Sequence, residues 1–350
     1  MRYWNILLLL TLIGVMSACD KQSMSQVMVL QGKVMGTVWR VVLFGVDSVH
    51  KKALQQAIQR QLDADDHMLS TWKPDSLLSR FNSYQGYAMQ PISADMADIV
   101  TKALRIGAKT KGAMDITIGR LVNLWGFGSV KQPVHMPTDA EITLVKTQTG
   151  LQHLRVIQTV AGQWLQKKNP GLYVDLSTMG EGYATDHLAR LIERQGINNY
   201  LVSVGGALFS RGHNGKGKSW RIAIQKPTDN ENTAQTYVNL QGYGISTSGS
   251  YRNYYELDGR RISHIIDPAT GWPIKHKLVS ATVIATTALE ADGWDTGLMV
   301  LGSEKAKELA LEQQLAVYLI SKEKDKFVSW MSPQFLIFLT KGKNGNRDNF

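Results

Sequence analysis

Three oxygen-bearing side chains lie close together in the C-terminal part of the sequence. Asp292, Asp295 and Thr296 belong to the segment 288–301, whose composition predicts a helix. Residues at positions i, i+3 and i+4 share one helix face, so the two carboxylates and the hydroxyl are predicted to lie together. An oxygen-only set of this kind suits Mg²⁺, which usually keeps further positions for waters and substrate phosphates. A solvated acidic face is the alternative interpretation.

A second group of polar side chains surrounds a predicted strand-to-helix turn. The apolar segment Leu172–Leu176 is typical of a short strand, and an apolar-periodic helix follows it. Asp175, Thr178 and Glu181 are therefore expected around the turn. A helix N-terminus favours phosphate, and carboxylate and hydroxyl oxygens suit the hard cation that accompanies phosphate. In the alternative interpretation, Ser177 or Thr178 is an ordinary helix cap and Asp175 a surface residue.

Two further residues are candidates for chemistry or ligand binding. His264 lies on a predicted strand and is a candidate base or phosphate contact, with a purely structural role as the alternative. Trp72 lies in a predicted loop before Pro74, where it either stacks on a flat ligand or caps the core. The single cysteine and the lack of an H-x-x-x-H pair do not indicate a zinc site. No Walker loop or G-x-S-x-G elbow is present.

The N-terminal residues have the pattern of a lipoprotein signal peptide. Arg2 precedes the apolar run Ile6–Met16, which is too short to span a bilayer. Cys19 follows small residues, as in a bacterial lipobox, where the cysteine becomes the diacylated first residue of the mature protein. We therefore expect a lipid anchor rather than a transmembrane helix, with an ordinary unpaired cysteine as the alternative. Asp20 resembles the signal that retains lipoproteins in the bacterial inner membrane, facing the periplasm.

The sequence predicts four regions. These are a signal peptide at 1–18, a lipidated tether at 19–30, a folded domain at 31–340 and a polar C-terminal tail at 341–350. The formal net charge of +10 is spread along the chain without a basic run, so nucleic-acid binding is not indicated. The charge is compatible with an anionic membrane surface or an anionic ligand.

Helices, strands and hairpins are predicted to be interspersed along the folded domain. A strand is expected at 34–43 and a hairpin turn at Asp258-Gly259, whereas 245–250 is either a turn or a set of hydroxyl donors near a ligand. Helices are expected at 53–69, at 93–110, after the Thr138 capping box, and at 288–301. This pattern indicates an α+β fold with largely antiparallel or mixed sheets flanked by helices. It forms a single domain, which its length would allow to have two subdomains.

Seven short segments, in this order, carry a resemblance to a known family. They are Met35-Gly-Thr, Ala113-Met-Asp-Ile-Thr, Asp175-Leu-Ser-Thr-Met-Gly-Glu-Gly-Tyr-Ala, Val204-Gly-Gly, Ile245-Ser-Thr-Ser-Gly-Ser, His264-Ile-Ile-Asp-Pro-Ala-Thr-Gly and Ala291-Asp-Gly-Trp-Asp-Thr. Together they resemble the ApbE family of FAD:protein FMN transferases. The similarity extends over essentially the whole mature chain and includes the lipobox. Linked motifs in a fixed order are far more specific than any one of them.

The resemblance implies an activity and a set of site residues. Members of the family use Mg²⁺ to cleave FAD, transfer FMN to a Ser or Thr hydroxyl of a target protein, and release AMP. By resemblance, the metal site contains Thr178, Asp292, Asp295 and Thr296, and His264 is the catalytic residue. The positions that resemble FAD contacts are Met35, Trp72, Ala113, Met114, Asp115, Asp175, Glu181 and Ile266. Trp72 departs from the tyrosine that is common in relatives, which preserves an aromatic face but loses a hydroxyl.

Two other functions use the same residues. An FAD pyrophosphatase would replace the acceptor hydroxyl with water, and a non-catalytic flavin-binding lipoprotein would only carry the flavin. The presence of Asp292, Asp295, Thr296 and His264 argues against the carrier, since storage needs no site for metal and phosphate. The resemblance further implies that the partners are target flavoprotein subunits of membrane-bound reductases.

The lipobox leads to a direct prediction. A Cys19→Ser variant should remain unprocessed or become soluble while keeping a near-normal fold, because Cys19 belongs to no predicted core element. Cell fractionation followed by a salt wash measures this. A variant that still partitions with membranes after the wash would show that Cys19 is not the point of attachment.

Overall fold

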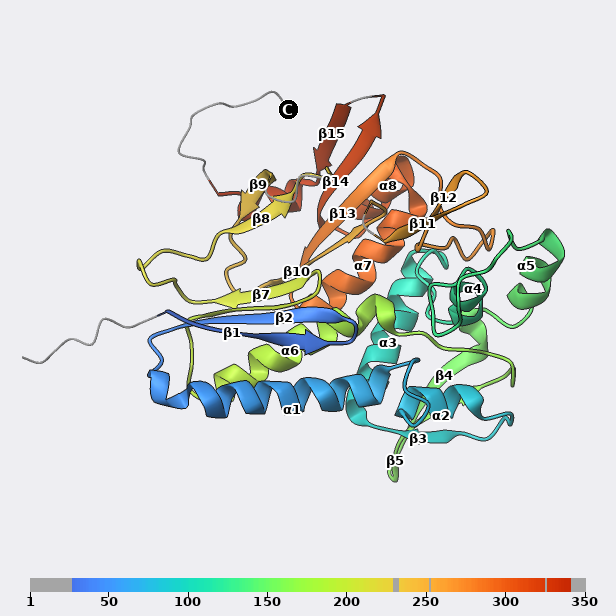
Figure 1. Cartoon of the computed structure of the whole chain (residues 1–350), viewed down its shortest axis with the longest axis horizontal. Coiled ribbons are helices and arrows are strands. Elements are labelled where there is room, and N and C mark those ends of the chain that lie inside the picture. Colours follow the sequence, from blue (N-terminus) through green and yellow to red (C-terminus); the bar gives the residue numbers. More distant parts are fainter. Residues whose placement is uncertain (1–26, 229–232, 252, 325, 341–350) are drawn as a thin grey trace, which may run out of the picture.

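The computed structural model of the chain describes residues 27–228, 233–251, 253–324 and 326–340 (Figure 1). The expected signal peptide at 1–18, the lipidation site Cys19, most of the tether at 19–30 and the tail at 341–350 lie outside the described residues. None of the helices in the described part of the chain is both long enough and apolar enough to cross a membrane.

An eight-stranded sheet forms the centre of the molecule, and every neighbouring pair of its strands is antiparallel. The spatial order is β1-β2-β6-β7-β10-β13-β14-β15. These strands are β1 (Val27–Val34), β2 (Thr37–Phe44), β6 (Tyr200–Val204), β7 (Ala207–Arg211), β10 (Gly244–Gly249), β13 (Leu278–Ala285), β14 (Ala316–Glu323) and β15 (Lys326–Met331). The sheet and its flanking helices confirm the predicted α+β class.

Helices cover one face of this sheet (Figure 1). They bury the side of β13 and β14 that carries Val283 and Leu319. The helices of this layer are α1 (Lys51–Leu69), α3 (Ala94–Lys109), α6 (Ser177–Arg194) and α7 (Ala288–Leu301). Helix α6 packs against α7, α1 against α6 and β1, and α3 against α7. Alternate residues of a strand point to opposite faces, so Ile284 and Ile320 bury the other face.

The opposite face is covered by a small hairpin and a short helix. These are β8 (Ile222–Gln225), β9 (Ala234–Val238) and η3 (Pro333–Phe338). The other short elements are η1 (Ser48–His50), α2 (Leu77–Ser83), β3 (Gln90–Ile92), α4 (Gly119–Leu124), α5 (Asp139–Lys146), η2 (Leu151–His153), β4 (Leu154–Thr159), β5 (Gly162–Lys167), β11 (Tyr254–Leu257), β12 (Arg260–Ser263) and α8 (Ser303–Glu312). The capping box predicted at Thr138 is present at the start of α5, and the Asp258-Gly259 hairpin joins β11 to β12.

The strand predicted at Leu172–Leu176 is not formed. Within the described residues, this segment makes a single isolated bridge, between Tyr173 and Ile118. The buried side chain of Asn82 takes the place of a neighbouring strand, because its Nδ2 donates to Val174 O and its Oδ1 accepts from Val174 N, both at 2.8 Å. Side-chain amide bonds of this kind are not visible in a hydrophobic pattern, so the sequence alone suggested a strand.

Two other segments differ from their predictions. Of the two interpretations of 245–250, the turn is wrong, since Gly244–Gly249 forms β10 in the interior of the sheet, whereas Ser246, Thr247 and Ser248 do place hydroxyl groups along a cleft. The glycines and hydroxyl residues of this segment look like turn chemistry, but Gly244 is required because a Cβ there would lie 2.1 Å from Ala288 N. The strand predicted at 34–43 is formed from Thr37 onward as β2, but it starts later than predicted, because Met35 and Gly36 make the β1–β2 turn with positive φ angles of 49° and 72°.

The close packing of α6 on α7 leads to a stability prediction. A Cβ on Gly182 would lie 2.4 Å from Ala288 O and 2.8 Å from the Cβ of Asp292, so Gly182→Ala should force the helices apart and cost about 1–3 kcal/mol. Gly180→Ala is the matched control in the same helix, because its Cβ would meet only Met35 Sδ, at 3.9 Å. This control should be neutral or stabilising by up to about 1 kcal/mol. Urea unfolding of both variants measures the difference, and equal costs would contradict the packing argument.

Candidate active site

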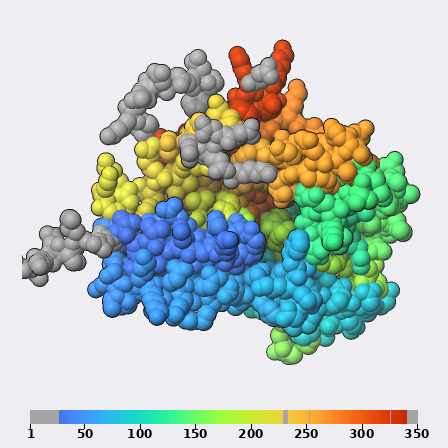
Figure 2. All heavy atoms as spheres, in the orientation of Figure 1, coloured from blue at the N-terminus to red at the C-terminus, as the bar shows by residue number. Residues whose placement is uncertain are grey.

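A cleft of about 800 Å³ opens beside the start of α6 and one face of α7, where they meet strands β7, β8 and β10. In Figure 2 the face shown is hollowed between the blue segment of β1 and β2 and the orange segment around β11 and β12. Most of the sequence-predicted site residues line it: Met35, Ala113, Asp115, Asp175, Thr178, Glu181, His264, Ile266, Asp292, Asp295 and Thr296. The fold therefore brings together residues that are spread over more than two hundred positions of the chain.

The acidic face of α7 is buried. Asp292 and Asp295 are 8% and 1% exposed, so the interpretation as a solvated acidic face is wrong. Asp292 Oδ2 accepts a hydrogen bond from Gly182 N at 2.8 Å, and Asp292 Oδ1 accepts one from Ser246 Oγ at 3.0 Å. Burial raises the pKa of both carboxyl groups well above the usual range. Repulsion from Glu181 raises the pKa of Asp292 further, and repulsion from Asp292 does the same for Asp295. Two carboxylates here need a compensating positive charge.

One hydroxyl oxygen in the cleft has no hydrogen-bond partner. Thr178 Oγ1 is buried and has no hydrogen bond. It is not a helix cap, because Leu176 holds the cap position of α6 and Ser177 is the first helical residue. In the described part of the chain, no group of three or more His, Cys, Asp or Glu side chains is placed to hold a metal ion. Two carboxylates with hydroxyl oxygens fit Mg²⁺, which is commonly bound through one or two carboxylates plus waters and substrate phosphates.

A second helix contact holds the acidic face in place. Asp186 of α6 accepts hydrogen bonds from Ala288 N and Leu289 N, both at 2.9 Å, and so satisfies two free N–H groups at the start of α7. Burial raises the pKa of Asp186 to about 6, and these two hydrogen bonds oppose the rise. Together with the Gly182–Asp292 bond, this contact fixes α7 relative to α6. Asp186 and Ser246 therefore position the candidate metal ligands. From the sequence, Ser246 was named only as part of the 245–250 segment, and Asp186 was not identified as a site residue.

Glu181 approaches the β6–β7 turn so closely that the turn must contain glycine. Glu181 Oε2 accepts a hydrogen bond from Gly206 N at 2.7 Å. A Cβ on Gly205 would lie 2.0 Å from Glu181 Oε1, and Gly205 has a positive φ of 52°. Burial raises the pKa of Glu181. The Val204-Gly-Gly motif is therefore part of the cleft, although only Glu181 was predicted as a site residue.

His264 follows β12 and lies in the cleft with a defined tautomer. Its Nδ1 lies 2.9 Å from Asn253 O, and a carbonyl oxygen only accepts, so Nδ1 carries the proton. Nε2 is then left as an acceptor. Burial lowers the pKa of His264, while the bond to Asn253 opposes the change. A neutral imidazole with a free Nε2 is suited to accept a proton near neutral pH.

Comparison with known proteins decides the family. The model of the ApbE family matches residues 35–319. The chain belongs to the ApbE family. It is 65% identical over 316 residues to the FAD:protein FMN transferase of Salmonella typhimurium, covering 90% of each chain. It is 63% identical over 324 residues to the FAD:protein FMN transferase of Escherichia coli strain K12, covering 93% of this chain and 92% of that protein.

Solved structures agree with the ApbE assignment. The flavin transferase ApbE from Vibrio cholerae superimposes with a TM-score of 0.81 at 40% identity, covering 90% of this chain and 100% of the other. The apo form of the Pseudomonas stutzeri flavinyl transferase ApbE gives a TM-score of 0.80 at 35% identity, covering 91% and 98%. The ApbE fold therefore accounts for the antiparallel sheet and its helical layer.

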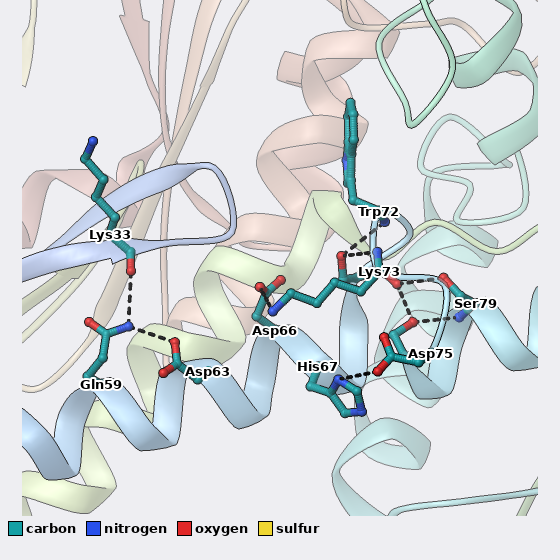
Figure 3. A network of polar contacts seen from close by, with 11 residues as sticks. Lys33, Gln59, Asp63, Asp66, His67, Trp72, Lys73, Asp75 and Ser79 are labelled. Atoms are coloured by element: carbon teal, nitrogen blue, oxygen red, sulfur yellow. Dashed lines mark hydrogen bonds and ion pairs between the residues drawn. The ribbon is translucent and has the colours of Figure 1, made fainter.

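Two positions that resemble FAD contacts of the ApbE family do not line the cleft. Met114 is fully buried in the core beneath it. Trp72 is 67% exposed on the loop between α1 and α2, where Trp72 N donates to Ser70 Oγ at 3.1 Å. Figure 3 shows the indole ring pointing away from the polar network formed by Ser79, Asp75 and their neighbours. Trp72 is therefore no cap of the core, and its ring is free to meet a ligand.

The buried carboxyl groups of this ApbE-family chain should make its stability depend on pH. Because the pKa of Asp295 is raised in the folded state, the folded state keeps protons that the unfolded state has lost above about pH 4. Without metal, the free energy of unfolding should therefore fall as pH rises through this window, by up to about 1.4 kcal/mol per pH unit for each proton.

Asp295→Asn should reduce that fall. Thermal melting in chelator between about pH 5 and pH 8 compares the two proteins. The lowered pKa of His264 contributes with the opposite sign, but it is common to both proteins and cancels in the comparison. If the free energy of unfolding fell equally with pH in the wild type and the variant, Asp295 would not have a raised pKa in the metal-free folded state.

Proposed function

We propose that this enzyme transfers FMN from FAD to a Ser or Thr hydroxyl of a target flavoprotein through a phosphoester bond and releases AMP. The chain is an enzyme whose curated relatives at 63–65% identity are named FAD:protein FMN transferase. One observation supports the proposal above all: two buried carboxylates with raised pKa values and a buried, unbonded Thr178 hydroxyl face one cleft. Such a site is built to receive a cation together with an anionic group.

The donor set fits Mg²⁺. Asp292, Asp295 and Thr178 would hold it, and Thr296 adds a hydroxyl on the same helix face. Bound there, Mg²⁺ would neutralise the pyrophosphate of FAD and act as a Lewis acid on it. Ser246 and Gly182 hold Asp292 in a fixed rotamer, so the oxygens are oriented before the ligand arrives.

The other residues position the two reacting groups. The start of α6, beside Thr178, is the positive end of the helix dipole and favours the anionic pyrophosphate. Met35, Asp115, Asp175 and Ile266 line the remainder of the cleft and are proposed contacts to FAD. Asp115 Oδ1 accepts bonds from Thr117 N and Thr117 Oγ1, at 2.7 Å and 2.6 Å, which fixes its side chain.

His264 is the proposed base. The acceptor hydroxyl oxygen forms a bond to the phosphorus of the FMN half, and the bond from that phosphorus to the AMP oxygen breaks. The hydroxyl proton passes to His264 Nε2, which is free because Nδ1 donates to Asn253 O. Positioning and charge stabilisation contribute more to a phosphoryl transfer of this kind than a covalent protein intermediate would.

We further propose that the enzyme is anchored through acyl chains on Cys19 in the bacterial inner membrane and faces the periplasm. The lipobox and Asp20 support this placement. The acceptors would then be flavoprotein subunits of membrane-bound reductases, which present their hydroxyl in the same compartment.

A transfer assay with a matched variant tests the proposed function. The enzyme is incubated with FAD, Mg²⁺ and a candidate acceptor, and the acceptor is examined by in-gel flavin fluorescence and by mass. We expect the mass increase of one FMN in the presence of Mg²⁺ and none in chelator. FMN and AMP appearing at the same rate without acceptor would instead identify a pyrophosphatase, and unchanged FAD would identify a carrier.

Asp292→Asn is the variant that isolates the metal site. The amide can still accept from Gly182 N and can donate to Ser246 Oγ, so the fold should persist. Loss of one carboxylate charge should lower the transfer rate by at least about 100-fold. It should also abolish the rise in melting temperature that Mg²⁺ with FAD gives to the wild type. A variant with the wild-type rate at low Mg²⁺ would refute the metal site.

Trp72 should contribute to flavin affinity through its ring face. Trp72→Tyr should leave the affinity for FAD nearly unchanged, whereas Trp72→Ala should weaken it by about 0.5–1.5 kcal/mol. The fold should be unaffected in both, because the side chain is 67% exposed. Fluorescence titration with FAD measures the affinities, and equal values for Ala and wild type would exclude stacking on Trp72.

A further inference from the structure

The end of the molecule at which the described chain begins carries an unbalanced set of positive charges. Four exposed lysines lie there: Lys51 and Lys52 in the first turn of α1, and Lys216 and Lys218 in the segment between β7 and β8. In Figure 1 the starts of β1 and α1 and the β7–β8 segment all lie at the left end of the molecule. No ion pair involves any of these lysines among the described residues.

Contacts around Val27 place these lysines on one surface. Val27 pairs with Phe44 in the β1–β2 hairpin. Gly215 lies against both, since a Cβ there would be 3.1 Å from the Phe44 ring and 3.3 Å from Val27 Cγ2. The His213 ring meets the Phe44 ring edge-on at 5.7 Å. The β7–β8 segment with its two lysines is thereby held beside the first described residue.

A shallow groove links the other two lysines to the same strand. Lys51, Lys52 and Val49 line it together with Val29 and other residues of β1 and α1. Gln55 Nε2 donates to Gln31 O at 2.9 Å across the groove and fixes α1 on β1. We call the surface formed by Val27, Val49, Lys51, Lys52, Lys216 and Lys218 the basic end.

The basic end exposes unpaired positive charges and apolar side chains to water, which is unfavourable for a folded chain without a partner. The first turn of α1 contains no acidic residue, so the positive end of the helix dipole opposes Lys51 and Lys52. Val49 and Val27 are 74% and 53% exposed. Among the described residues near this end, two acidic side chains are already engaged: Asp47 Oδ1 accepts from Val49 N at 2.9 Å, and Glu193 pairs with Arg211 at 2.7 Å. Exposed valines beside unpaired lysines match a surface of apolar tails and anionic headgroups.

The position of the lipid anchor indicates what the basic end contacts. Cys19 precedes Val27 by eight residues, so a chain of that length holds Val27 within about 29 Å of the acylated cysteine. We propose that the basic end docks on anionic phospholipid headgroups of the membrane that holds the anchor. This inference rests on the proposed lipid attachment of Cys19 but is independent of the transfer chemistry.

Docking through the basic end would set the distance between the cleft and the membrane surface. Helix α6 begins in the cleft at Ser177 and ends at Arg194. Five residues further on, Asn199 O accepts a hydrogen bond from Phe44 N at 3.0 Å, which brings this end of α6 close to the basic end. The 18 residues of α6 rise by about 27 Å. A docked enzyme would therefore hold the cleft roughly one helix length above the headgroups. An acceptor protein in the same membrane would have to present its hydroxyl at that height.

Hydrogen exchange on vesicles tests the docking. The full chain, processed and lipidated in cells, is reconstituted into phosphatidylcholine vesicles with and without phosphatidylglycerol. We expect the amides of residues 48–52 and 213–219 to exchange at least about tenfold more slowly on the anionic vesicles, and high salt to remove this protection. Equal exchange on both vesicle types would overturn the proposal, as would protection that arises only when an acceptor protein is added.

Charge-reversal variants provide the matched comparison. Replacing Lys51, Lys52, Lys216 and Lys218 by Glu should abolish the protection, whereas the same change at the remote exposed residues Lys131, Lys305, Lys322 and Lys326 should preserve it. Protection that survives in the first variant would overturn the proposal. FMN transfer to a soluble acceptor should be unchanged in both variants, so a failed transferase assay is distinguishable from failed docking. The mass of the Cys19 peptide reports lipid attachment separately, and an unacylated Cys19 in the cell-derived protein would overturn the proposal, because the anchor is what places the basic end at the membrane.

Discussion

The contact between α6 and α7 at Gly182 is the constraint on which the site depends. No side chain fits between the helices there, and Gly182 N donates a hydrogen bond to the carboxylate of Asp292. Asp186, one turn further along α6, bonds the first N–H groups of α7. These bonds place the acidic face of α7 opposite Thr178 at the start of α6, so one helix pair defines both sides of the candidate metal site.

The electrostatics of the site follow from this packing. The close helix contact excludes water, and burial then raises the pKa values of Asp292 and Asp295. Without a cation, the folded chain avoids part of this cost by keeping protons on the carboxyl groups, because charged carboxylates are costly to remove from water unless they are paired. Under the proposed function, a divalent cation bound together with the pyrophosphate would offset the remaining cost, and the anionic substrate would complete the coordination of a site with few protein ligands.

Individual residues show which features of the fold and the site could be predicted from the sequence and which could not. The acidic face of α7 was predictable because helical spacing and an apolar helix determine it locally. Its burial was not, since that depends on Gly182 and Ser246, which are distant in sequence. The segment Leu172–Leu176 was misassigned for a related reason: the bonds that hold it extended come from the Asn82 side chain rather than from a strand. The place of Trp72 outside the cleft lining also required the three-dimensional structure.

The central claim is that Asp292, Asp295 and Thr178 form one divalent metal site at the cleft. Anomalous diffraction from crystals grown with Mn²⁺ and FAD tests it most directly, because Mn²⁺ accepts the same oxygen ligands as Mg²⁺ and is located without reference to activity. The account predicts an anomalous peak in contact with the carboxylate oxygens of Asp292 and Asp295 and with the pyrophosphate. A fully occupied FAD with no peak at these residues, or with Mn²⁺ bound elsewhere in the cleft, would contradict it.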